Sequence, residues 1–224
     1  MKMSSSIKGL LIKDFNLLKG QKNFFLGILV LWAIVGACNF DPIFLVAYVM
    51  MMFSFFTLST LSYDEYENGA AYLFTLPITR KDYVIEKYLF GFLTSTVPCI
   101  VISVIFYVVL AVMGSATDPV EYFVGSAMVL PIAWLILALE IPVQLKFGRE
   151  KSRIAILIPL GVVAVIVMLV VRLCDAAGIG KPEIIDQISN VNGGVILAIA
   201  AVVFVVLLWI SYSISCRIVE KKQF

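Results

Sequence analysis

The sequence contains no histidine among its 224 residues, and only 14% of them are charged. The absence of imidazole excludes histidine-based catalytic triads, histidine general bases and every zinc motif that requires a histidine ligand. The four cysteines are widely spaced and form no Cys-x-x-Cys pair, so we assign them no redox or metal role. The formal net charge of +2 is too small to indicate a nucleic-acid partner.

A phosphate-binding loop is also missing from the sequence. Such a loop requires Gly-x-x-x-x-Gly-Lys followed by Ser or Thr. The nearest stretch, 178–182, lacks both the first glycine and the hydroxyl, and in the stretch 150–152 the lysine follows a glutamate. We therefore expect this chain to bind no nucleotide cofactor and to have no catalytic site of its own.

Apolar residues, in contrast, make up 62% of the chain, whereas soluble domains contain about 45–50%. A helix needs about 20 mostly apolar residues to cross the hydrocarbon core, and lipid offers no partner to backbone polar groups outside a helix. We therefore predict an all-α, polytopic membrane protein. Its six predicted transmembrane helices are 23–39, 42–63, 89–113, 122–145, 153–173 and 193–215.

The basic residues indicate the orientation of these spans. All Lys and Arg residues except Arg172 and Lys181 lie in the N-terminal segment, in the loops after the second and fourth spans, or at the C-terminus. Because cytoplasmic loops carry an excess of Lys and Arg, we predict that both termini lie in the cytoplasm.

The first 22 residues form a region distinct from the transmembrane domain, 23–224. Lys8, Lys13 and Lys19 are positioned to bind lipid phosphate groups, which favours an interfacial elbow helix with membrane lipids as partners. A basic flank that only sets the topology is the alternative. Apolar side chains recur at helical spacing, at Ile7, Leu10, Leu11, Phe15 and Leu18.

The predicted cytoplasmic loop at about 64–88 is longer than the four to six residues that a simple turn needs. It combines acidic and basic residues with aromatic and leucine side chains. We predict a short helix that stops near Pro77, followed by a helix capped by Thr79 with Asp82 in its first turn. A short amphipathic helix here would be a docking surface for a soluble partner, and a solvated loop is the alternative.

The residues of this loop resemble a known pattern. Asp64, Glu65 and Glu67 are followed by Gly69, by Leu-Pro-Ile-Thr-Arg at 76–80 and by Lys87. The order of an acid, a small residue, Leu-Pro-hydroxyl-Arg and a Lys resembles that of the type-2 ABC-exporter permease family. The second cytoplasmic loop, 146–153, with Pro142 before it, is similar to a Pro…Phe-Gly…Lys…Arg element of one bacterial branch of that family.

The resemblance implies a half-transporter in the bacterial cell membrane that forms a homodimer. Each copy would dock one separate ABC ATP-binding subunit, which would carry ATP and Mg. The loop at 64–80 would be the main coupling helix, and the loop at 146–153 a smaller contact. The docking residues that it implies are Asp64, Glu65, Glu67, Gly69, Leu76, Pro77, Thr79, Arg80, Phe147, Gly148 and Arg149.

Glu140 is the acid placed inside an apolar run, where a charge costs roughly 2.5–3.5 kcal/mol at the bilayer centre. It is a candidate gate or a contact for a cationic substrate. Alternatively, it is an interfacial acid balanced by Lys146 or Arg149.

Little of the sequence is predicted to lie outside the cell. The outer loop at about 172–192 has the composition of a short helix or re-entrant segment, and no binding domain for an imported solute is present. This favours export of a hydrophobic or amphipathic substrate, and the resembling branch includes exporters of peptides. Two other classes stay open: a stand-alone immunity or sensor protein, and an intramembrane enzyme, for which no catalytic pair is evident.

Overall fold

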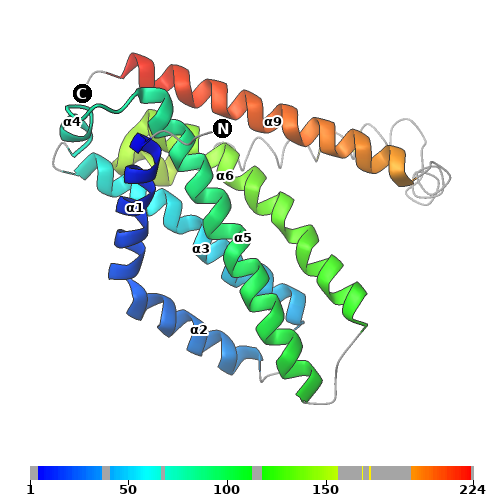
Figure 1. Ribbon diagram of the computed structural model, residues 1–224. Coiled ribbons are helices and arrows are strands. Elements are labelled where there is room, and N and C mark those ends of the chain that lie inside the picture. The colour runs from blue at the N-terminus through cyan, green and yellow to red at the C-terminus, as the bar shows by residue number, and fades with distance from the viewer. Residues whose placement is uncertain are drawn as a thin grey trace.

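The computed structural model describes residues 5–36, 41–66, 69–112, 118–155, 168, 172 and 193–222. Within these ranges every regular element is a helix, which confirms the all-α class (Figure 1). In chain order the helices are α1 (Ser5–Gly20), α2 (Lys22–Gly36), α3 (Pro42–Glu65), α4 (Gly69–Leu73), α5 (Arg80–Val112), α6 (Pro119–Ala155) and α9 (Gly193–Lys221).

Four of these helices are long and apolar enough to cross a membrane: α3, α5, α6 up to Gly148, and α9 from Ala201. They contain most of the second, third, fourth and sixth predicted spans. The first predicted span corresponds to α2, of which 15 residues are described, fewer than the about 20 that a crossing needs. Residues 37–39 of this span lie outside the described residues. The fifth predicted span lies largely outside the described residues, as does the outer loop at 172–192. Six spans are therefore not confirmed.

Local sequence explains where two of the spans begin. Asp41 precedes Pro42 at the start of α3, and its carboxylate accepts a hydrogen bond of 2.8 Å from the backbone N–H of Ile43. Asp118 precedes Pro119 at the start of α6 in the same way, and accepts a bond of 3.0 Å from the N–H of Val120. An Asp cap followed by proline satisfies a free donor and presets the first helical residue.

The helices α3, α5 and α6 pack against one another, and α9 packs against α6 and α5. Helix α1 crosses α5 and α3, while α2 runs beside α3 (Figure 1). The first half of α9 extends away from the other helices (Figure 1). The helix α4, the end of α3, the start of α5 and the end of α9 lie together, and we call this region the α4 end of the bundle.

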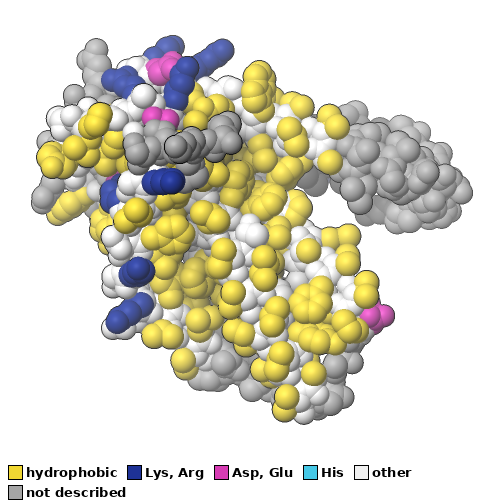
Figure 2. All heavy atoms as spheres, viewed as in Figure 1, with side chains coloured by type: hydrophobic (Ala, Val, Ile, Leu, Met, Phe, Trp, Pro, Cys, Tyr) yellow, Lys and Arg dark blue, Asp and Glu magenta, His cyan; other side chains and the backbone are white. Residues whose placement is uncertain are grey.

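The largest group of buried apolar side chains joins six helices at the α4 end. Leu10 of α1, Leu73 of α4 and Val219 of α9 all belong to it, together with residues of α3, α5 and α6. Away from this core, large apolar side chains cover most of the visible surface, and charged side chains gather mainly near the α4 end (Figure 2). An exposed apolar belt with charges at one end suits contact with lipid.

Candidate functional site

The short helix α4 begins the candidate site. It is anchored by Leu73, which is buried in the core of the α4 end, while Tyr72 is 72% exposed and Leu76 is 44% exposed. The chain then turns through Pro77, and the Thr79 hydroxyl accepts a hydrogen bond of 3.1 Å from the N–H of Asp82. The predicted short helix and the predicted Thr79 cap are both present.

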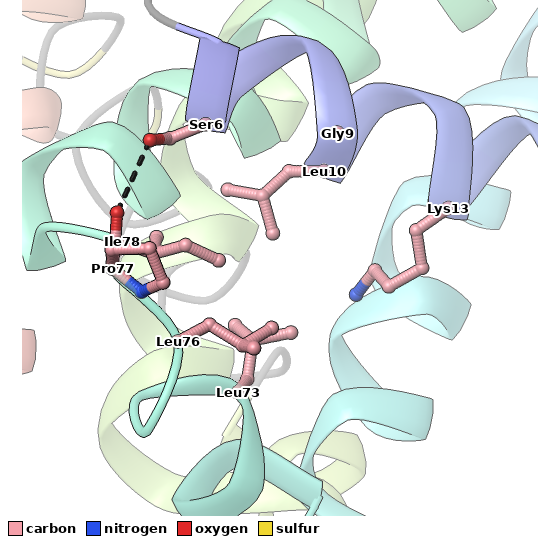
Figure 3. A pocket seen from close by; sticks show the side chains of 8 residues that line it. All are labelled: Ser6, Gly9, Leu10, Lys13, Leu73, Leu76, Pro77 and Ile78. Atoms are coloured by element: carbon pink, nitrogen blue, oxygen red, sulfur yellow. Dashed lines mark hydrogen bonds between the residues drawn. The ribbon is translucent and has the colours of Figure 1, made fainter.

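A pocket of about 470 Å³ lies between α4 and the N-terminal half of α1 (Figure 3). Its walls are mainly apolar, with Leu10 on one side and Leu73 and Leu76 on the other. The Ser6 hydroxyl donates a hydrogen bond of 3.2 Å to the carbonyl oxygen of Pro77 at its rim. The elbow helix therefore contacts the predicted docking loop directly.

Beneath this pocket lies a buried charge cluster, formed by Lys13, Asp14, Asp64, Glu86 and Lys87. The side chain of Lys87 is fully buried, and its Nζ lies 2.5 Å from Asp14 Oδ2 and 2.8 Å from Asp64 Oδ2. Lys13 also forms an ion pair with Asp64. The charge cluster thus joins α1 to the end of α3 and the first turns of α5.

Two hydroxyl groups complete the surroundings of the charge cluster. Lys87 Nζ donates to Thr60 Oγ1 at 3.3 Å, and the hydroxyl of Tyr83 donates to Asp64 Oδ2 at 3.1 Å. The Lys87 ammonium also lies 5.3 Å from the centre of the Tyr83 ring. These partners offset part of the cost of burying the Lys87 charge.

One part of the charge cluster is not satisfied in this way. Both carboxyl oxygens of Glu86 and the Oδ1 atom of Asp14 are buried, and none receives a hydrogen bond within the described ranges. The closest ion-pair contacts are 3.6 Å from Glu86 Oε2 to Lys87 Nζ and 3.2 Å from Asp14 Oδ1 to Lys13 Nζ. The Glu86 and Asp14 carboxyl groups therefore share one cation, since Asp14 Oδ2 also lies 2.5 Å from Lys87 Nζ.

The two predicted docking loops meet at Glu65. Its carboxylate is 2.6 Å from Lys222 Nζ, and Lys222 also donates to the carbonyl oxygen of Leu145 at 3.2 Å. Gly148 is beside the same carboxylate, with a φ of 70° and a ψ of 179° that interrupt α6. This backbone conformation is essentially restricted to glycine. The residues of both loops are therefore joined through the C-terminal end of α9.

Arg80 makes a second connection to the end of α9. Its guanidinium donates to the carbonyl oxygens of Val219, at 2.9 Å, and Glu220. Carbonyl groups in the last turn of a helix have no partner within that helix, so a cation there is stabilising. Arg80 thus fastens the start of α5 to the end of α9.

The residues that were predicted to dock an ATPase therefore fall into two groups, one with contacts inside the chain and one that is exposed. Asp64, Glu65 and Arg80 make contacts within the chain, whereas Leu76, Pro77 and Thr79 are exposed beside Tyr72. Phe147 is 40% exposed at the break in α6. Gly69 starts α4 close to the backbone of Asp64. Glu67 and the side chain of Arg149 lie outside the described part of the structure.

Glu140 lies on the buried side of α6 and is 5% exposed. In the part of the chain that the structure describes, no Lys or Arg forms an ion pair with it, and its Oε2 atom receives no hydrogen bond. The expected partner Lys146 points its ammonium toward the Phe147 ring, 5.3 Å away. The described contacts thus do not include the balancing ion pair with Lys146.

Sequence reasoning missed Asp14, Glu86 and Lys222 as members of the site. Asp14 had a usable signal, because it lies four residues after Leu10 and four before Leu18, on the apolar stripe of the elbow helix. An acid at such a position calls for a buried partner.

Lys13, expected to face lipid phosphates, instead pairs with Asp64. Nothing local singles out Lys222, whose partner is 157 residues away.

Comparison with known proteins agrees with this architecture. The curated proteins and the solved structures each contain no match to the chain. The family described as "ABC-2 family transporter protein" matches residues 9–220, which is nearly the whole chain and includes every helix described above except the first four residues of α1 and the last residue of α9. Together with its apolar helices, this match shows that the chain is a multi-pass membrane protein belonging to the ABC-2 transporter family.

Proposed function

We propose that the chain is the permease subunit of an ATP-driven exporter, and that its α4 end faces the cytoplasm. Membership of the ABC-2 family supports a role in transport and implies a separate ATP-binding partner subunit. Lys and Arg side chains near the α4 end support the orientation, because cytoplasmic ends of spans are enriched in them.

The observation that carries the docking proposal is the exposure of Tyr72 and Leu76. Tyr72 projects from α4 and Leu76 from the turn that follows it, at the charged end of the bundle, where lipid does not cover them in the proposed orientation. Exposed apolar groups outside the membrane mark sites of protein contact, and large aromatic side chains often dominate such interfaces. We propose that both insert into the ATPase, with Phe147 as a neighbouring contact.

The contacts around α4 also provide a route for coupling. A displacement of α4 would act on α5 through the Thr79 cap, on α1 through the bond from Ser6 to Pro77, and on α9 through Arg80. Rigid-body movement of packed helices is a common form of conformational switching. The work of transport would come from ATP binding more tightly to one state than to the other, because equal affinity shifts no equilibrium.

The docking test is co-purification of the full-length chain with the ATPase encoded beside it. Replacing Tyr72 and Leu76 together with alanine removes two exposed side chains, of which Leu76 also lines the pocket against α1. If both are central to the interface, each substitution weakens the complex by about 2 kcal/mol or more, roughly 30-fold. Val120→Ala at the opposite end of α6, which also removes an exposed apolar side chain, leaves the complex unchanged.

If the double variant retains the ATPase as well as the parent chain does, α4 is not the docking surface. If the parent chain itself purifies without any ATPase, the exporter proposal fails.

We further propose a homodimer that exports an amphipathic substrate, such as a peptide, with Glu140 as a gate. Stimulation of ATP hydrolysis by candidate substrates, compared between the parent and Glu140→Gln, tests the substrate and gate assignments.

A further inference from the structure

The buried charge cluster has more negative than positive groups. Lys13 and Lys87 supply two positive charges, and Asp14, Asp64 and Glu86 supply three carboxyl groups. Full ionisation would leave one uncompensated negative charge in a site where Asp14, Glu86 and Lys87 are completely buried. An unpaired charge at such a depth is strongly unfavourable, and a buried group avoids it by becoming neutral.

The positions of the unsatisfied atoms show where neutralisation is possible. Asp64 is an unsuitable site, because its two oxygens already accept from Lys13, Lys87 and Tyr83. Glu86 and Asp14 retain three buried oxygens that receive no hydrogen bond from the described residues, and both carboxyl groups lie beside the same ammonium, at 3.6 and 2.5 Å from Lys87 Nζ. Two carboxylates can only accept hydrogen bonds, so two of them held at one buried ammonium repel each other unless one holds a proton.

We propose that the charge cluster binds one proton, which is taken from solvent and shared between Glu86 and Asp14 oxygens. The bound proton makes the cluster neutral and lets the two neighbouring carboxyl groups form a hydrogen-bonded pair. The pair joins α5 to α1, beside Asp64 at the last turn of α3. Proton binding therefore holds the elbow helix against the bundle next to the segment that leads to α4.

The charged and titratable groups in and around the cluster come from three elements. Helix α1 contributes Lys13 and Asp14, α3 contributes Asp64, and α5 contributes Tyr83 and Lys87. Helices α6 and α9 also pack against α5, but none of their side chains enters the ion pairs of the cluster within the described residues. The two lysines are the cations already present, and the proposed proton is the third positive charge.

The direct test is infrared spectroscopy of the full-length chain in lipid nanodiscs near neutral pH. A protonated carboxyl group has a carbonyl stretch that a carboxylate lacks. We expect this band in the parent chain and its loss in both Glu86→Gln and Asp14→Asn. Glu65→Gln, which removes a carboxyl from the ion pair with Lys222 at the same end, retains it. A band that survives both substitutions in the pair overturns the proposal.

A pH titration of stability gives an independent readout. The folded chain would hold one proton that the same carboxyl groups release when the chain is unfolded. As the pH rises from the pKa of these carboxyl groups in the unfolded chain to that of the pair in the folded chain, the folding equilibrium constant therefore falls up to about tenfold per pH unit. Glu86→Gln keeps the shape without needing the proton and loses this slope, and so does Asp14→Asn. Equal slopes in the parent and both variants overturn the proposal. So does stabilisation of the parent by sodium or potassium in place of protons, which would assign the site to a metal cation.

Discussion

Replacing Lys87 with methionine removes the ammonium group at the centre of the buried charge cluster while keeping a long, flexible side chain. The substitution eliminates the ion pairs to Asp14 and Asp64, at 2.5 and 2.8 Å, and the hydrogen bond to Thr60. One lysine, Lys13, then remains beside three carboxyl groups. The variant therefore tests whether the charge cluster holds the elbow helix in place.

The expected cost follows from the burial of the partners that remain. Removing one member of a buried ion pair typically costs about 3–5 kcal/mol, because the other charge stays buried without compensation. That corresponds to roughly a hundred- to several-thousand-fold in the folding equilibrium, against a total stability of about 5–15 kcal/mol for a typical domain. Additional protonation of Asp64 would reduce the loss, so the largest effect is expected at high pH.

The assay is thermal unfolding of the full-length chain in nanodiscs, combined with limited proteolysis near Gln21, between α1 and α2. Lys81→Met is the matched control, because Lys81 is exposed in the first turn of the same helix and an exposed substitution usually changes stability by less than about 0.5 kcal/mol. We expect Lys87→Met to lower the unfolding temperature and to speed cleavage near Gln21. The control behaves as the parent does.

Adding Asp64→Asn to Lys87→Met supplies the complementary measurement. The double variant leaves one lysine beside two carboxyl groups, so the excess of carboxyl groups returns from two to one, as in the parent, and we expect it to be more stable than Lys87→Met alone. The deviation from additivity measures the coupling of the two side chains. If Lys87→Met is as stable as Lys81→Met across the pH range, the cluster is hydrated and does not hold α1.

Two further predictions concern the contact between the predicted docking loops. Glu65→Lys lowers the free energy of unfolding by about 0.5–1 kcal/mol, because the partly exposed ion pair with Lys222 is lost. In a double-mutant cycle, adding Lys222→Glu restores most of this loss. A double variant no more stable than Glu65→Lys alone would show that the pair contributes nothing. Gly148→Ala costs about 1–3 kcal/mol in thermal unfolding, because the φ of 70° with a ψ of 179° disfavours any side chain and the new Cβ would lie 3.3 Å from the Glu65 carboxylate. Unchanged stability in Gly148→Ala would mean that the break in α6 is not needed.

Much of the architecture is readable from the sequence because its signals are local. The apolar runs predict α3, α5, α6 and α9, since a span must be long, apolar and helical in lipid. Thr79 and Pro77 predict the division between α4 and α5 for the same reason: a cap and a helix breaker act on the residues beside them. The match with the family confirms what the spacing of residues 64–80 had indicated by resemblance.

Other predictions required information that lies far away in the chain. The roles of Glu65 and Arg80 depend on α9, and their partners are 157 and 139 residues distant. No periodicity in the loop indicates these contacts, which place both side chains within the chain's own packing.

The sequence alone determined that the chain is helical and embedded in a membrane, because the apolar composition and the length of the apolar runs must match the solvent that surrounds the protein. Only the tertiary structure decided that Asp14, Asp64 and Lys87 form one buried group, since they come from three helices and Lys87 is 73 residues from Asp14. Coulomb interaction depends on distance and burial after packing. In the sequence, the position of Asp14 on an apolar stripe calls for a buried partner without identifying it, and packing supplies Lys87 and so connects the elbow helix to the bundle.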